Sequence, residues 1–162
     1  MGSNGGNPQM SRSNSDEESA YVRQRLLEYN VSHVDATINN VYEPINIIVR
    51  NDDGGIVGGL LAVRYWDCMR IDILWVDVEF RGSGYGRLLL LQIEDIAVQT
   101  HCRFIQVDTL SFQAPEFYKK YGYQVIGAVE DIHGGHDRYY FIKRIKQTDP
   151  AVVSSTEYTH LR

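Results

Sequence analysis

The spacing of apolar and polar residues changes along the chain. Near the N-terminus the apolar residues recur with the period of an α-helix. Residues 1–15 are nearly all Gly, Ser, Asn and other polar types, so we expect a disordered tail there. Ser15 and Glu18 form a capping-box pattern, which predicts a helix running to about Asn30. The apolar positions of this helix are compatible with a single buried stripe: Ala20, Val22, Leu26 and Leu27.

The period changes to that of β-strands after residues 31–44, a stretch without a clear pattern that Pro44 closes. INIIVR and IVGGLLAVRYW flank the turn NDDGG, which predicts an antiparallel hairpin. A third run starts at Met69 and alternates between two faces. We expect one face to carry Met69, Ile71, Ile73 and Trp75, and the other Arg70, Asp72, Leu74 and Val76.

The remaining half alternates helices with strands. YGRLLLLQIEDIAVQTH has helical length, RFIQVDTL predicts a strand and APEFYKKYG a short helix. YQVIGAV and RYYFIKRI predict two more strands, and residues 147–162 show no periodicity, so we expect an irregular tail. The pattern predicts one α/β domain over residues 16–146.

Composition and charge narrow the classes of protein. The chain has 162 residues, the size of one domain, and 43% hydrophobic residues are too many for a disordered chain. No apolar run approaches the roughly 20 residues that span a bilayer, so we expect no membrane partner. The net charge of −5 argues against nucleic-acid binding and favours cationic partners. Cys68 and Cys102 are isolated, without metal-ligand spacing, and with no signal pattern present we expect a cytoplasmic protein.

A glycine-rich turn carries the most chemical information. The strand ILWVDV leads into RGSGYG and directly into a helix, whose free N–H groups and dipole favour an anion. Arg81 and Arg87 flank this turn with positive charge. The pattern indicates a pyrophosphate cradle, with a ligand-free connection as the alternative. The spacing fits neither G-x-G-x-x-G, because Arg87 occupies the last position, nor a Walker motif, because Gly-Lys-Ser/Thr is absent.

R-x-x-G-x-G, preceded by V-D-x-E and an aromatic residue, resembles the acyl-CoA-binding motif of the GNAT superfamily of N-acetyltransferases. The order of elements and the later FYKKYGY segment extend the resemblance over about residues 16–145, although Val78 stands where Pro is usual. It implies a small, single-domain, bacterial-type member with the GNAT fold. That fold is a central mixed, mostly antiparallel twisted sheet flanked by helices. In that fold the fourth and fifth strands move apart at one end, and in this chain these two strands would be residues 69–77 and 103–109.

The resemblance further implies acetyl-CoA as co-substrate and no metal. Backbone groups of Leu74 and Val76 would pair with the pantetheine arm, and one of their N–H groups could stabilise the oxyanion. Many family members have a coenzyme-contacting Asn where this chain has Ser111, and Gln113 could serve instead. We expect these residues to bind the coenzyme: Leu74, Trp75, Val76, Arg81, Gly82, Ser83, Gly84, Tyr85, Gly86, Arg87, Ser111 and Gln113.

Tyr118 stands where many family members place a general acid. A phenol with a pKa near 10 can protonate a leaving thiolate whose pKa lies near 8.5, by analogy with cysteine. The alternative is that Tyr118 only hydrogen-bonds the sulfur or packs. We expect Tyr121 and Tyr123 to be core or turn residues.

Two carboxylates are candidates for the base. Asp72 shares the predicted strand face of Leu74 and Val76, which would aim it at the cleft; the alternative is a salt bridge with a neighbouring Arg. Asp108 is the second candidate and a substrate-binding residue. His136 could line the acceptor pocket or be a solvated surface residue.

These inferences predict an N-acetyltransferase that moves an acetyl group from acetyl-CoA to a primary amine of a small molecule by direct attack in a ternary complex. Neither cysteine is placed to form a covalent intermediate. Protein acetylation, at an N-terminus or a lysine, is one alternative, and a non-catalytic acyl-CoA-binding module is another. Members of the family often form homodimers, and no residue here decides that point.

Overall fold

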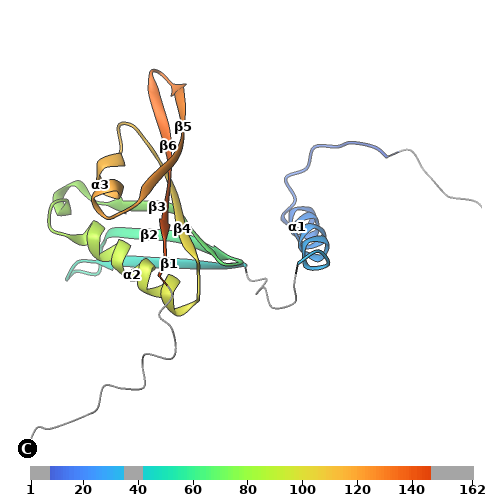
Figure 1. Ribbon diagram of the computed structural model, residues 1–162, viewed down its shortest axis with the longest axis horizontal. Helices are drawn as coiled ribbons and strands as arrows, with labels where there is room; N and C mark the ends of the chain where they lie inside the picture. The colour runs from blue at the N-terminus through green and yellow to red at the C-terminus, as the bar shows by residue number, and fades with distance from the viewer. Residues whose placement is uncertain (1–7, 35–41, 147–162) are drawn as a thin grey trace, which may run out of the picture. The chain divides into compact units, whose positions relative to one another are not determined.

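The computed structural model describes residues 8–34 and 42–146, which belong to two separate units (Figure 1). The first holds one helix and the second holds the sheet. Of the expected tails, residues 147–162 and residues 1–7 lie outside the described residues, and residues 8–15 form no helix or strand. Residues 16–146, which we expected to form one domain, are divided between these two units.

Helix α1 spans Asp16–Val31 and begins as predicted. The Ser15 hydroxyl accepts a hydrogen bond from the Glu18 N–H at 3.3 Å, and acidic residues fill the first turn. Within its own unit no residue of α1 is buried and Leu26 is 59% exposed, so the buried apolar stripe stays a prediction. A lone helix has nothing in its own unit to pack against.

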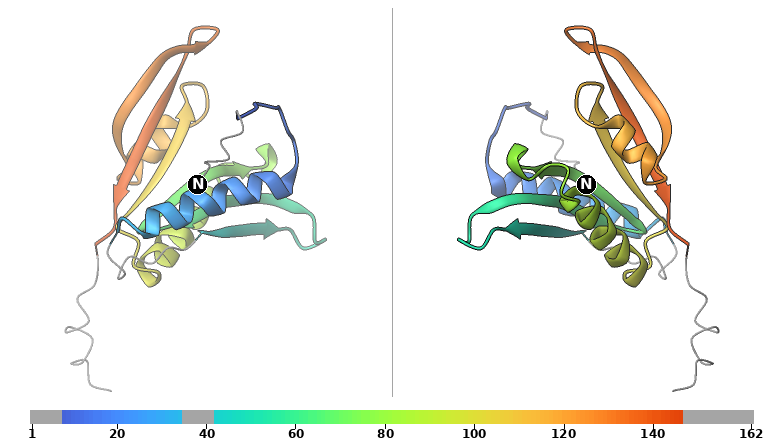
Figure 2. Two further views of the ribbon diagram at one scale, coloured as in Figure 1. Left: turned by 90° about the vertical axis from the view of Figure 1, so that its right-hand side faces the viewer. Right: turned by 90° about the vertical axis from the view of Figure 1, so that its left-hand side faces the viewer.

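The second unit is an α/β structure, as expected, with one six-stranded mixed sheet in the order β1-β2-β3-β4-β6-β5. All neighbouring strands are antiparallel except β3 and β4, which are parallel. Figure 2 shows α2 lying along one face of the sheet. The elements are β1 Tyr42–Arg50, β2 Ile56–Tyr65, β3 Cys68–Val76, η1 Val78–Phe80, α2 Tyr85–Gln99, β4 Phe104–Leu110, α3 Pro115–Lys120, β5 Gln124–His133 and β6 His136–Arg144.

Strand β1 starts at Tyr42, two residues before Pro44, so Pro44 does not close the preceding segment as expected. β1 is an edge strand of the sheet. Proline is tolerated at an edge because the N–H that it lacks can be one that faces away from the neighbouring strand.

The core lies between the sheet and α2. Leu60 and Ile71 from the sheet pack with Leu89 and Ile93 from α2, and all four are at most 1% exposed. Burying side chains of this size contributes roughly 1.5–3 kcal/mol each. This packing fixes the start of α2 against the end of β3, where the glycine-rich turn lies.

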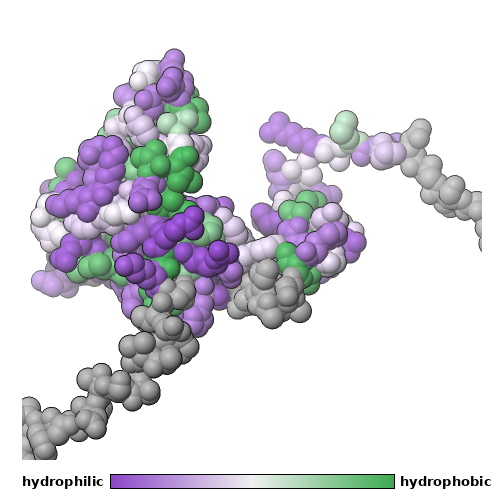
Figure 3. All heavy atoms as spheres, in the orientation of Figure 1, coloured by the Kyte–Doolittle hydropathy of each residue, from purple (hydrophilic) through white to green (hydrophobic). Residues whose placement is uncertain are grey.

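The β5–β6 hairpin extends the sheet beyond β4, and β5 is the other edge strand. All of β5 is exposed, including Val125 and Ile126. Figure 3 shows mostly polar residues on the visible surface of this unit, with apolar ones gathered along the hairpin. β6 pairs with the whole of β4 and so holds that strand in place.

Strand β3 contains a bulge at Asp72. Ala62 of β2 pairs with Ile71, whereas the preceding Leu61 pairs with Ile73. One extra residue therefore stands in β3 opposite an uninterrupted β2. A bulge of this kind bends the strand and reverses the faces to which later side chains point.

The expected alternation along β3 is therefore wrong beyond Ile71. Leu74 and Val76 join the core side, whereas Ile73 is 52% exposed and Trp75 is 44% exposed.

Strands β3 and β4 pair only from Cys68 to Ile71 and from Phe104 to Val107. Beyond these residues the two strands part. The separation falls between the two expected segments. Among the described residues, however, these are the third and fourth strands rather than the fourth and fifth.

Candidate active site

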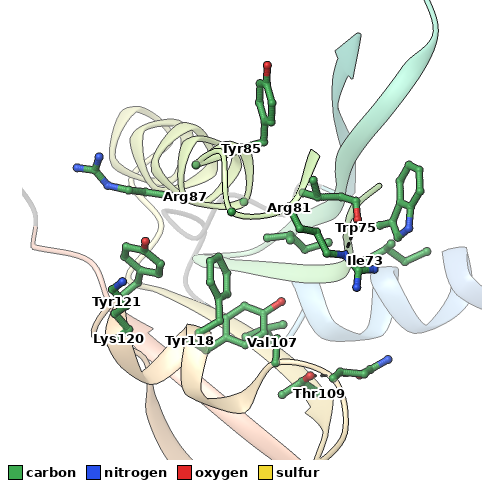
Figure 4. Close-up of a pocket in the computed structure, with 18 of the residues that line it drawn as sticks. Ile73, Trp75, Arg81, Tyr85, Arg87, Val107, Thr109, Tyr118, Lys120 and Tyr121 are labelled. Carbon is green, nitrogen blue, oxygen red and sulfur yellow. Dashed lines mark hydrogen bonds between the residues drawn. The ribbon is translucent and has the colours of Figure 1, made fainter. Parts of the chain in front are cut away.

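A cleft of about 820 Å³ opens where β3 and β4 part. Its walls come from the end of β3, the glycine-rich turn, the start of α2, the end of β4 and α3 (Figure 4). The structure therefore brings most of the predicted site residues together. Those that line the cleft are Asp72, Leu74, Trp75, Val76, Arg81, Gly82, Gly84, Tyr85, Gly86, Arg87, Asp108, Gln113 and Tyr118.

Three predicted site residues do not line the cleft: Ser83, Ser111 and His136. The Ser111 hydroxyl accepts a hydrogen bond from the Asp137 N–H at 3.2 Å and lies 3.3 Å from Nδ1 of His136. These contacts join the end of β4 to the start of β6, so both side chains support the hairpin beside the cleft.

The glycine-rich turn presents an unusual run of free donors. No described residue accepts a hydrogen bond from the backbone N–H groups of residues 82–87, which include the first N–H groups of α2. Gly82 and Gly84 adopt φ values of +80° and +90°, which favour glycine and produce the tight turn. The open N–H groups and the positive end of α2 suit a bound anion.

Arg81 ties this turn to β3. Its Nε donates a hydrogen bond to the Val76 carbonyl oxygen at 3.0 Å (Figure 4). On the far side of the turn, a Cβ at Gly86 would lie 3.2 Å from the Phe117 ring, so α3 packs closely against the start of α2. The cradle is thus held between β3 and α3.

Tyr118 is 5% exposed and lies among the rings of Phe117, Tyr123 and Phe141, at centroid distances of 5.4, 5.6 and 5.8 Å. Figure 4 shows its hydroxyl pointing into the cleft. Burial, with a smaller effect from the charge of Asp108, raises the pKa of Tyr118 to about 12. The phenol is therefore a protonated donor across the neutral range.

Asp72 forms the salt bridge that was the alternative to a catalytic role. Its carboxylate accepts from Arg70 Nε at 2.6 Å, and this hydrogen bond raises the pKa of Arg70. The Asp72 side chain is 40% exposed and still lines the cleft. Asp72 is also the extra residue of the bulge in β3.

Asp108 lies on the opposite wall, at the end of β4. Arg138 of β6 approaches it with an Nε to Oδ2 distance of 3.6 Å. The same carboxylate contributes to the raised pKa of Tyr118, so the charge of Asp108 reaches the phenol. Asp108 and Tyr118 therefore act on the same part of the cleft.

Gln113 is held with its amide nitrogen unpaired. Its Oε1 accepts from the Thr109 hydroxyl at 3.1 Å and from the Leu110 N–H at 2.8 Å. No described residue accepts from its Nε2, and Gln113 lines the cleft, so this amide group can donate to a ligand.

Sequence reasoning missed several lining residues, among them Phe117, Thr109 and Lys120. Tyr121 follows α3 and packs partly buried against the core, as expected, and it also lines the cleft. Phe117 and Lys120 stand three residues apart in a helical segment, and that spacing was the available signal that they share a face.

The comparisons with known proteins agree with this geometry. The model of the acetyltransferase (GNAT) family matches residues 12–123, and the chain belongs to this family. The Blasticidin-S acetyltransferase of Streptomyces morookaense is 34% identical over 93 residues, which are 57% of this chain and 68% of that protein. The chain is thus similar to a curated acetyltransferase over the greater part of that enzyme.

Solved structures show the same fold. An acetyltransferase from Bacillus cereus is 40% identical, with a TM-score of 0.75, over 84% of this chain and 97% of that one. A Bacillus anthracis protein assigned as a streptothricin acetyltransferase, solved with acetyl coenzyme A, is 21% identical with a TM-score of 0.58. The match covers 70% of this chain and 69% of that one, and it shows the fold alone.

GNAT acetyltransferases use acetyl-CoA, and the residues of this cleft fit that coenzyme. The free N–H groups of residues 82–87 suit its pyrophosphate, and Arg81 and Arg87 add positive charge on opposite sides of this turn (Figure 4). Across the residues that the structure describes, no helix is long and apolar enough to cross a membrane.

Proposed function

We propose that this protein transfers the acetyl group of acetyl-CoA to a primary amine of a small molecule, by direct attack in a ternary complex. The observation that carries the proposal is the cleft between β3 and β4. It joins an anion cradle at the glycine-rich turn to a buried, protonated Tyr118 and two carboxylates.

The coenzyme is held mainly by backbone groups in this proposal. The N–H groups of residues 82–87 bind the pyrophosphate, with Arg81 on one side of the turn and Arg87, also a coenzyme-binding residue, on the other. When bound, acetyl-CoA supplies an acetyl group as a thioester that an amine can attack. A backbone N–H of Leu74 or Val76, at the free edge of β3, stabilises the charge on the carbonyl oxygen, a contribution of typically about 10²–10³ in rate.

Tyr118 acts as the general acid. Its hydroxyl points into the cleft and keeps its proton until its pKa of about 12, so it can donate that proton to the departing sulfur. Acid catalysis of this kind contributes typically about 10²–10⁴ in rate. The surrounding rings hold the phenol in one orientation.

Asp72 and Asp108 attract the cationic amine and accept the proton that it must lose, directly or through a water molecule. Arg70 donates to Asp72 at 2.6 Å and so competes with the amine for that carboxylate. Asp108 has a longer contact, 3.6 Å, to Arg138. Both remain candidates for the base, with Asp72 on the β3 wall and Asp108 on the β4 wall.

A small-molecule acceptor is supported by two observations. A relative 34% identical to this chain is named for a small molecule, blasticidin S. The net charge of −5 and the two carboxylates in the cleft also suit a cationic amine.

Direct transfer is supported by the position of the thiols. Cys68 and Cys102 are buried and neither lines the cleft. Burial raises the pKa of the Cys68 thiol to about 11, which keeps it protonated and weakly nucleophilic at neutral pH. Neither cysteine is therefore suited to carry the acetyl group.

The test is a thiol-release screen of amines with acetyl-CoA as donor, followed by mass spectrometry of the product. We expect a small primary amine to be acetylated, with one free thiol released per product. Acetylation of peptides but of no small amine would contradict the proposed acceptor class. Binding of acetyl-CoA without transfer to any amine would instead indicate a non-catalytic module.

A further inference from the structure

The cleft contains a cation on α3 that the proposed reaction does not use. Lys120 is the last residue of α3 and lines the cleft. No described carboxylate pairs with it, and its Nζ lies 5.9 Å from the centre of the Tyr121 ring. In a chain of net charge −5, an unpaired lysine in a cleft needs an explanation.

The packing of α3 explains where Lys120 lies. Phe117 packs on Gly86, so this face of α3 is turned towards the start of α2. Lys120 follows Phe117 by three residues and therefore lies on the same face. Arg87 directly follows Gly86 and also lines the cleft. Figure 4 shows Arg87, Lys120 and Tyr121 on one side of the cleft, away from Arg81.

The neighbouring Lys119 is different. Its Nζ donates to Glu116 at 2.7 Å, on another face of the helix, and it does not line the cleft. The two adjacent lysines therefore carry the same charge in different settings: one paired with a carboxylate, and the other unpaired in the cleft.

We infer that Lys120, together with Arg87, binds the 3′-phosphate on the ribose of coenzyme A. This inference rests on the proposed function. The free N–H groups of residues 82–87 already match the pyrophosphate. Coenzyme A carries one further phosphate, and two cations without described carboxylate partners stand beside the cradle, on the side away from Arg81. A phosphate is the group that such a pair recognises.

The experiment compares coenzyme A with dephospho-coenzyme A, which lacks only the 3′-phosphate, by calorimetric titration. We expect the unaltered protein to bind coenzyme A about tenfold more tightly. Lys120→Met keeps the apolar stem and removes the charge, and it should reduce this preference to about twofold or less. Lys119→Met, the matched control, should keep the preference, and Lys120→Arg should largely restore it.

Three results would overturn the inference. One is an unchanged preference in Lys120→Met. Another is an equal loss of affinity for both ligands, which would place Lys120 at the pyrophosphate, and a third is an equal effect of Lys119→Met. Thermal unfolding without ligand verifies that each variant folds. Failure of the unaltered protein to bind either ligand would contradict the proposed function itself.

Discussion

Asp72 and Asp108 occupy matching positions on the two strands that border the cleft. Ile71 and Val107 are the last paired residues of β3 and β4, and each aspartate is the next residue on its strand. The two carboxylates thus stand where the strands part, and each is in contact with an arginine. An amine that enters the cleft therefore approaches one carboxylate on each wall.

Removing either carboxylate should weaken the acceptor's binding. We expect Asp72→Asn and Asp108→Asn each to raise KM for a cationic amine by about twofold to fivefold, since a partly exposed charge pair contributes up to about 1 kcal/mol. Whichever of the two variants removes the base should also have a lower kcat. The decrease should be largest at neutral pH and below, where the amine is protonated. Steady-state rates across pH measure both effects. A pH–rate profile that Asp72→Asn leaves unaltered would reject Asp72 as the base.

Tyr118→Phe removes one hydroxyl from a ring that stays packed. We expect kcat to fall by about 10²-fold, because the leaving sulfur loses its proton donor, while affinity for coenzyme A stays within about twofold. Tyr121→Phe is the matched control, as Tyr121 also lines the cleft, and should keep most of the activity. Equal turnover by Tyr118→Phe and the unaltered protein would show that Tyr118 is not the acid.

Gly82→Ala tests the cradle. At a φ of +80° an added Cβ is strained, so we expect a loss of about 1 kcal/mol of stability and about tenfold weaker binding of coenzyme A. Gly54→Ala is the control, because Gly54 has a φ of +82°, has open space around it, and lies in the β1–β2 turn. It should lose similar stability and keep its affinity. If both variants lost affinity alike, the turn at residues 82–87 would not be the anion site.

The buried phenol also predicts how stability changes at high pH. Burial raises the pKa of Tyr118 from its ordinary value near 10 to about 12. A raised pKa means that the folded state holds the proton more tightly, so the stabilisation is complete below pH 10 and is lost as the pH rises towards 12.

In urea unfolding across this range, we expect Tyr118→Phe to lose less stability than the unaltered protein, by up to about 2 kcal/mol. Tyr21→Phe, on the exposed surface of α1, should behave as the unaltered protein does. If Tyr118→Phe lost as much stability at alkaline pH as the unaltered protein, the phenol of Tyr118 would not be desolvated in the folded state.

Most of the fold could be predicted because period and turn chemistry are local properties. The hairpin of β1 and β2 and the strand–turn–helix around RGSGYG follow directly from them. The bulge at Asp72 does not, because it depends on the register with β2 and leaves the alternating pattern of β3 unchanged in the sequence. The faces of Leu74 and Trp75 were misassigned for that reason.

In the candidate site too, features that depend on local sequence could be predicted, and features that depend on tertiary contacts could not. Backbone donors at residues 82–87 could be located from the motif, since glycine spacing determines the turn. Side chains that depend on tertiary contacts could not: Ser111 and His136 support the hairpin. The adjacent Lys119 and Lys120 look alike until the ion pair with Glu116 distinguishes them.

The most direct test of the central claim, direct transfer within one cleft, is a two-substrate initial-rate measurement. It varies acetyl-CoA at several fixed concentrations of the best acceptor from the amine screen. Double-reciprocal lines that intersect, with no acetyl group on the protein by mass spectrometry, are the result that we predict. Parallel lines, together with an acetylated protein when acetyl-CoA is added without acceptor, would contradict it.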